Sequence, residues 1–129
     1  MSFLSEDDVY EYAHGICFKT GPPGLVGAEY EWLVVDPERP GDIVPLSRLA
    51  AAVAAAAPLP AGSVVSYEPG GQLELSSPPL PGPAAVHRAL VTDLRHLDPY
   101  LTAAGLRRTG RGLDPVRAPR RQLDLPRYA

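Results

Sequence analysis

The chain has 129 residues, of which 45% are hydrophobic and 21% charged, so it can form one globular domain or part of one. Its net charge of −3 argues against a nucleic-acid partner, and its single cysteine, Cys17, excludes an internal disulfide. The sequence shows no secretory signal and no apolar run approaching the ~20 residues of a membrane span. We therefore expect a cytoplasmic protein without nucleic-acid or membrane partners.

A helix and then a strand are expected in the first third of the chain. A capping-box pattern at residues 5–8, followed by apolar residues at helical spacing, predicts a helix over residues 6–17. After a Gly-Pro loop, alternating residues predict a strand over residues 25–36. Side chains alternate between the two faces of a strand, so Glu29 and Glu31 share one face and their apolar neighbours share the other.

A β-hairpin is expected from residues 63–68 and 72–77. A two-residue loop would mix apolar and acidic side chains on each face. A three-residue loop, whose last glycine suits a left-handed conformation, separates an apolar face from a polar face, and this consistency favours the second register. The polar face then carries Ser66, Glu68, Gln72, Glu74 and Ser76.

Helices and a short strand are expected in the remaining segments. Ser47 is the predicted N-cap of a short Ala-rich helix. Pro83 suits the first turn of a long helix, which Pro99 should kink or split. The apolar stripe of this helix is expected to be Val86, Leu90, Leu94, Leu97 and Leu101. A strand is expected over residues 106–111, followed by an extended loop over 115–129. These elements predict an α+β fold in which an antiparallel sheet is flanked by helices.

Acidic side chains on both polar strand faces indicate a cation site. Two carboxylates about 6.5–7 Å apart on one strand face repel each other by about 2.5 kcal/mol at an effective dielectric constant near 20. A hard cation such as Mg²⁺ or Mn²⁺ would remove this repulsion. A solvated acidic face, where water and salt screen the charges, is the alternative. The candidate metal ligands are Glu29, Glu31, Glu68 and Glu74.

Several common catalytic patterns are missing from the sequence. The histidines have no metal-ligand spacing, and Lys19 is the only lysine, so no Walker-type phosphate loop is present. No nucleophile elbow is present either. Any nucleotide site must therefore bind the phosphates without a Walker-type loop.

Five strings of residues carry a family resemblance. They are Cys17-Phe18-Lys19-Thr20-Gly21-Pro22-Pro23, Gly27-Ala28-Glu29-Tyr30-Glu31-Trp32, Glu68-Pro69-Gly70-Gly71-Gln72-Leu73-Glu74-Leu75-Ser76, Gly112-Leu113-Asp114-Pro115 and Leu125-Pro126-Arg127-Tyr128. On these strings, the chain resembles the N-terminal part of glutamate–cysteine ligases, in the bacterial group, related to the plant enzymes, that makes γ-glutamylcysteine for ergothioneine synthesis.

The resemblance implies a fold, a reaction and roles for particular residues. The fold would be glutamine-synthetase-like, with the sheet curved into a bowl. ATP would phosphorylate the γ-carboxylate of glutamate, and the cysteine amine would displace phosphate from the acyl phosphate, with Mg²⁺ or Mn²⁺ present. Glu29 and Glu31 would be metal ligands, and Glu68 and Glu74 would complete the metal shell or contact glutamate. Glu31 and Glu74 would also be catalytic, and Gln72 and Arg127 would bind substrate or nucleotide.

The resemblance also implies a longer protein. Family members continue well past Ala129, so we expect residues 1–129 to be the N-terminal portion of a single catalytic domain that is inactive alone. Two alternatives stay open, namely a ligase that uses a different amine and a non-catalytic module that binds a metal or a ligand. A nucleic-acid-binding tail would require salt-dependent binding by the arginines of residues 107–127.

Overall fold

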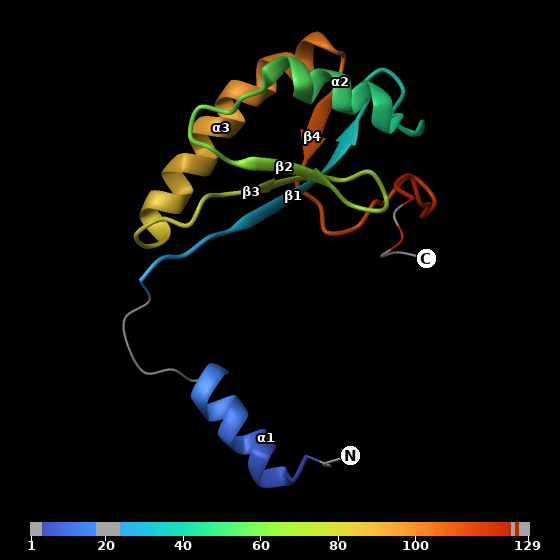
Figure 1. Ribbon diagram of the computed structural model, residues 1–129. Coiled ribbons are helices and arrows are strands. Elements are labelled where there is room, and N and C mark those ends of the chain that lie inside the picture. Colours follow the sequence, from blue (N-terminus) through green and yellow to red (C-terminus); the bar gives the residue numbers. More distant parts are fainter. Residues whose placement is uncertain (1–3, 18–23, 125, 127–129) are drawn as a thin grey trace.

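An antiparallel sheet is the central element of the computed structural model, which describes residues 4–17, 24–124 and 126. In this described part the sheet has four strands in the order β2-β3-β1-β4 (Figure 1). All three strand pairs are antiparallel. The strands are β1 (Glu29–Val35), β2 (Val64–Tyr67), β3 (Leu73–Ser76) and β4 (Arg107–Thr109).

Two helices, α2 (Leu46–Ala56) and α3 (Pro83–Ala103), cover the same face of the sheet (Figure 1). The predicted apolar stripe of α3 is buried along its whole length, and it packs with α2 against the apolar strand face. This arrangement confirms the expected α+β class. No helix of the described residues is both long and apolar enough to cross a membrane. The core includes Trp32, Val34, Leu49, Val53, Leu73, Leu75, Leu90, Leu94, Leu97 and Leu101.

The hairpin has the register that the polar and apolar faces predict. Ser66 lies opposite Glu74, and the Glu68 amide donates a 3.0 Å hydrogen bond to the Gln72 carbonyl. The loop between them has three residues, and Gly71 has φ +84°, the left-handed conformation in which glycine is favoured. The polar face is therefore directed away from α2 and α3.

Strand β1 begins later than expected, at Glu29 rather than at residue 25. The reason lies in the partner strand, where Ser77 is followed by two prolines that have no N–H to donate. The Ser77 hydroxyl accepts the hydrogen bond of the Ala28 amide at 3.0 Å. Pairing resumes only at an isolated bridge between Val26 and Leu80. The sheet thus ends at the serine, although the alternation of residues continues.

The start of α2 corrects a second expectation. The helix begins at Leu46, its N-cap is Pro45, and no side chain caps it. The Pro45 carbonyl accepts hydrogen bonds from the amides of Arg48 and Leu49, at 3.0 and 3.3 Å. Ser47 therefore lies inside the first turn, and the prediction that it is the N-cap was wrong.

Helix α3 runs without interruption through Pro99, so the expected split does not occur. A proline inside a helix costs about 3 kcal/mol. Leu97 and Leu101, on either side of it, are both almost completely buried. Burial of each leucine contributes about 1.5–3 kcal/mol, which together offsets the cost of the proline.

The N-terminal helix has the expected extent but two kinds of turn. Helix α1 (Glu6–Tyr12) has the predicted capping box, in which Ser5 and Asp8 exchange hydrogen bonds. It continues as a π-helix, η1 (Ala13–Cys17). Both elements lie apart from the sheet in Figure 1, and none of their residues is buried.

Candidate functional site

Three glutamates of the polar sheet face lie close together. Each of them offers a carboxylate oxygen, and these oxygens lie within 4.8 Å of one another. Glu31 in β1 is directly opposite Glu74 in β3, and Glu68 directly follows β2. We call Glu31, Glu68 and Glu74 the acid cluster. Its members come from β1, from β3 and from the end of β2, and they meet because β1 and β2 both pair with β3.

Two serines of the same face orient one of these carboxylates. The hydroxyl of Ser66 donates a 2.7 Å hydrogen bond to Oε1 of Glu74, and that of Ser76 donates to the same oxygen at 3.2 Å. Both serines lie on neighbouring positions of the polar face. The Glu74 carboxylate is therefore held in one orientation by its neighbours.

The electrostatics of the acid cluster favour a cation. Two unit charges within 4.8 Å of each other repel by at least about 3.5 kcal/mol at an effective dielectric constant near 20. Solvent reduces this figure for the exposed Glu31. Glu68 and Glu74 are half-buried, so water screens their charges less. Carboxylate oxygens are the ligands that Mg²⁺ and Mn²⁺ prefer, and this donor set fits either ion.

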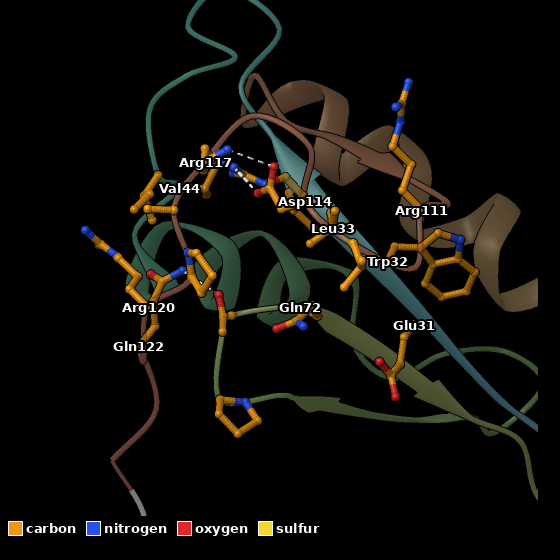
Figure 2. A pocket seen from close by; sticks show the side chains of 18 of the residues that line it. Glu31, Trp32, Leu33, Val44, Gln72, Arg111, Asp114, Arg117, Arg120 and Gln122 are labelled. Carbon is orange, nitrogen blue, oxygen red and sulfur yellow. Dashed lines mark hydrogen bonds and ion pairs between the residues drawn. The ribbon is translucent and has the colours of Figure 1, made fainter.

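A pocket of about 880 Å³ lies next to the acid cluster, and Glu31 is the cluster member that lines it. Its walls are formed by Glu31 and the residues that follow it in β1, by the hairpin turn 69–71 with Gln72, and by the loop 110–122. Figure 2 shows Glu31 and Gln72 on the sheet side of this pocket and Arg120 and Gln122 on the loop side. The pocket thus has an acidic side and a side that carries arginines.

Gln72 has an unused hydrogen-bond acceptor at the pocket. Its Oε1 atom is buried and has no hydrogen-bond partner among the described residues. A β carbon at Gly70 would lie 2.5 Å from this atom, so the absence of a side chain at Gly70 makes room for the Gln72 amide. A buried acceptor without a partner is costly, and an N–H or O–H donor of a ligand would satisfy it.

Trp32 forms part of the pocket wall and is held from the helix side. The guanidinium of Arg108 lies 5.0 Å from the centre of its ring. Arg108 in turn makes two hydrogen bonds, of 2.7 and 2.9 Å, to the carboxylate of Asp98 in α3. A paired guanidinium over an aromatic face is a favourable arrangement, and it fixes this wall against the helix layer.

The remaining predicted site residues lie outside the acid cluster. Glu29 is on the same face of β1 as Glu31, but it lies opposite Ser76 and is exposed. The structure therefore groups three of the four predicted metal ligands, and the role of Glu29 stays a prediction. Arg127 lies outside the described residues, so the prediction for it also stays open.

The loop 110–122 is the part of the site that sequence reasoning missed. Its residues were expected as the end of a strand over 106–111 and the start of an extended loop over 115–129, with a string of the family resemblance between them. Its contacts are with residues far away in the chain. Its one local signal is Asp114, whose carboxylate accepts hydrogen bonds from the amides of Val116 and Arg117, at 3.0 and 3.1 Å. Such turns are typical of aspartate, but they do not reveal a pocket wall.

Comparisons with known proteins agree on one family. Residues 25–129 match the family model described as glutamate-cysteine ligase family 2. The chain is 40% identical over 118 residues to the protein named glutamate–cysteine ligase EgtA of Mycobacterium tuberculosis, which covers 92% of this chain and 27% of that protein. It is 34% identical over 129 residues to the EgtA of Mycolicibacterium smegmatis, which covers 100% of this chain and 30% of that protein.

These relatives are much longer than the chain, which spans about 30% or less of their length. No solved structure matches this chain.

Proposed function

Because this chain belongs to glutamate-cysteine ligase family 2, we propose that the protein containing it joins the γ-carboxylate of L-glutamate to the amine of L-cysteine with the help of ATP. The product would be γ-glutamylcysteine, used for ergothioneine biosynthesis. The observation that carries this proposal is the acid cluster next to a pocket, which Glu31 of the cluster lines and which carries arginines on its other side. A metal ion bound by the acid cluster and the arginines on the other side of the pocket would both attract the negative charges of a substrate with phosphates.

The proposed reaction has two steps. A carboxylate is a poor electrophile, so one oxygen of the glutamate γ-carboxylate first attacks the terminal phosphorus of ATP, giving an acyl phosphate and ADP. The cysteine nitrogen then attacks the acyl carbon, the bond from carbon to the phosphate oxygen breaks, and phosphate leaves with the electron pair. The nitrogen loses a proton as the amide forms. Phosphoryl transfer depends mainly on positioning and charge stabilisation.

Glu31, Glu68 and Glu74 are the residues that would hold Mg²⁺ or Mn²⁺. When bound, the ion would neutralise the charge of the nucleotide phosphates. The carboxylates would hold the ion at the sheet face, and the hydroxyls of Ser66 and Ser76 keep Glu74 in orientation. Glu29 would be a further ligand from the outer end of β1. Glu31 and Glu74 would be the catalytically important members, because they are paired across β1 and β3.

Gln72 and Arg127 would bind substrate or nucleotide. The buried Oε1 of Gln72 needs a donor, and the ammonium group of glutamate is one candidate. The planar guanidinium of Arg127 suits a carboxylate or a phosphate. The proposed fold of the whole protein is glutamine-synthetase-like, with this sheet as part of a curved, bowl-shaped surface that faces the substrates.

The decisive test is ADP release by the full-length protein with Mg²⁺, glutamate and a series of amines. We expect turnover that requires cysteine and falls at least about 100-fold in Glu31→Gln, since a charge-stabilising ligand is lost. Glu38→Gln, an exposed carboxylate in the loop after β1, is the matched control and should keep its activity. Turnover with a different amine and none with cysteine would identify that amine as the substrate. No turnover with any amine would favour a non-catalytic module.

A further inference from the structure

A largely buried ion pair lies within the loop after β4 and helps to fix it. We call residues 110–122 the strap. Within it, Nε of Arg117 donates a 2.5 Å hydrogen bond to Oδ2 of Asp114 (Figure 2). The Arg117 side chain is only 9% exposed and that of Asp114 only 23%. A buried guanidinium is costly unless it is paired, so these contacts have to be made together.

The same guanidinium attaches the strap to the body of the domain. Nη1 of Arg117 donates hydrogen bonds to the carbonyls of Val34 in β1, at 3.1 Å, and of Asp42, at 3.5 Å. These two carbonyls lie at the end of β1 and in the loop that follows it. The middle of the strap is therefore fixed to the end of the sheet by a single side chain.

The end of the strap is attached to the hairpin turn. The backbone amide of Gln122 donates a 2.6 Å hydrogen bond to the Pro69 carbonyl, and its side-chain amide donates a 3.0 Å hydrogen bond to the Gly70 carbonyl. The Gln122 side chain also fills the space that a β carbon at Gly71 would need. This turn connects Glu68 with Gln72, so the strap ends against the loop that positions two candidate ligand-binding residues.

We propose that the Asp114–Arg117 pair is a positioning pair, which holds the strap in place and, through Gln122, the hairpin turn that carries Glu68 and Gln72. The strap residues between the two attachment points include Arg120 and Arg121, and both line the pocket. The pair thus sets the width of the pocket between its acidic and its cationic side. What the pocket binds rests on the proposed function, but the coupling between pair, strap and turn does not.

A merely stabilising ion pair would behave differently from a positioning pair. Loss of a stabilising pair lowers the stability of the whole domain, whereas loss of a positioning pair loosens the strap and the turn while the sheet core stays protected. Lysine at position 117 keeps the charge, but it cannot make the planar contacts to the carboxylate and the carbonyls together. We therefore expect Arg117→Lys to loosen the strap and the turn less than Arg117→Ala does, but more than no substitution.

Hydrogen–deuterium exchange on the full-length protein tests this proposal. We expect Arg117→Ala to speed exchange at least about tenfold in residues 118–124 and also in the turn 68–72, with little change in β1 and α3. Gln122→Ala should loosen the turn but leave residues 110–117 protected. The control is Arg39→Ala, which removes an exposed guanidinium that pairs at the same spacing with Asp36 and Asp42. In a steady-state assay, Arg117→Ala should raise KM about tenfold with a smaller change in kcat.

Two outcomes would overturn the proposal. One is unchanged exchange in the turn 68–72 when the strap is loosened, because the two would then be independent. The other is a uniform rise in exchange across the domain, which would make the pair a stabilising one. The exchange measurement stays decisive even if the protein shows no ligase turnover, so a failure of the proposed function would not be mistaken for a failure of this inference.

Discussion

The guanidinium of Arg48 in α2 donates a 2.8 Å hydrogen bond to the carboxylate of Asp36, which directly follows β1. The same guanidinium donates two further hydrogen bonds, of 3.2 and 2.7 Å, to the carbonyl of Ala104 at the end of α3. There the chain turns at Gly105, with φ +68°, and the Leu106 amide bonds back to the Leu101 carbonyl at 2.8 Å. One side chain thus joins both helices to the end of the sheet.

This relationship predicts a loss of stability at low pH. The hydrogen bond from Arg48 lowers the pKa of Asp36 below its usual value of 3.8, although burial opposes the shift. The native state therefore gains stability that is complete above pH ~4 and is lost as the pH falls through the lowered pKa. Urea unfolding between pH 2 and 6 should show this loss. Arg48→Ala should flatten the pH dependence, whereas Arg95→Ala, an exposed arginine of α3, should leave it unchanged.

A second prediction concerns Asp93, a completely buried carboxylate in α3. Its two oxygens accept hydrogen bonds from the amides of Ala61 and Ser63, at 2.6 and 2.9 Å. Asp93→Ala leaves a buried and a half-buried donor without this partner, so we expect the free energy of unfolding to fall by about 2–5 kcal/mol. The neighbouring control Thr92→Ala is exposed and should change it by less than about 0.5 kcal/mol. Equal effects of the two substitutions would contradict this role.

A third prediction tests the contact of the turn with the strap. Gly71→Ala places a side chain at φ +84° and against the Gln122 amide, so it should destabilise the protein by about 1–3 kcal/mol. Gly41→Ala, where no atom lies within 4 Å of the added carbon, is the control. Adding Gln122→Ala to Gly71→Ala should remove the collision but not the backbone strain. A double variant as stable as the wild type would show that the strain is negligible.

A fourth prediction concerns cation binding by the acid cluster. Calorimetric titration with Mn²⁺ should show at least about tenfold weaker binding in Glu31→Gln and in Glu74→Gln, because each removes a charged ligand. Glu29→Gln should have a smaller effect, because Glu29 lies outside the cluster. A saturating cation should raise the midpoint of thermal unfolding, and a chelator should reverse this increase. If Glu29→Gln weakens cation binding most, the site lies nearer the start of β1 than the acid cluster does.

A fifth prediction concerns the activity of residues 1–129 on their own. We expect no ADP release from this chain with glutamate, cysteine and Mg²⁺, because it spans 30% or less of the matched relatives. The full-length protein measured in parallel is the positive control. ADP release by the 129 residues alone, abolished by Glu31→Gln, would show that the chain is a complete catalytic unit.

Local patterns were sufficient for the hairpin and for the acidic character of its face. The register followed from keeping polar and apolar side chains on separate faces, because a shift by one residue would have exchanged the two faces. The helical stripe of α3 followed in the same way from its period. The sequence did not reveal that Pro99 would be tolerated, because the burial of Leu97 and Leu101 that offsets it is a tertiary effect.

By itself, then, the sequence determined which faces are polar, which residues enter the core and which glutamates could bind a cation. Only the tertiary structure decided that β1 pairs with β3, which brings Glu31 opposite Glu74 and leaves Glu29 outside the cluster. It also decided that the strap returns to the hairpin turn through Arg117 and Gln122. The physical reason is that alternation and helical period are properties of neighbouring residues, whereas strand partners and buried ion pairs depend on contacts between distant segments.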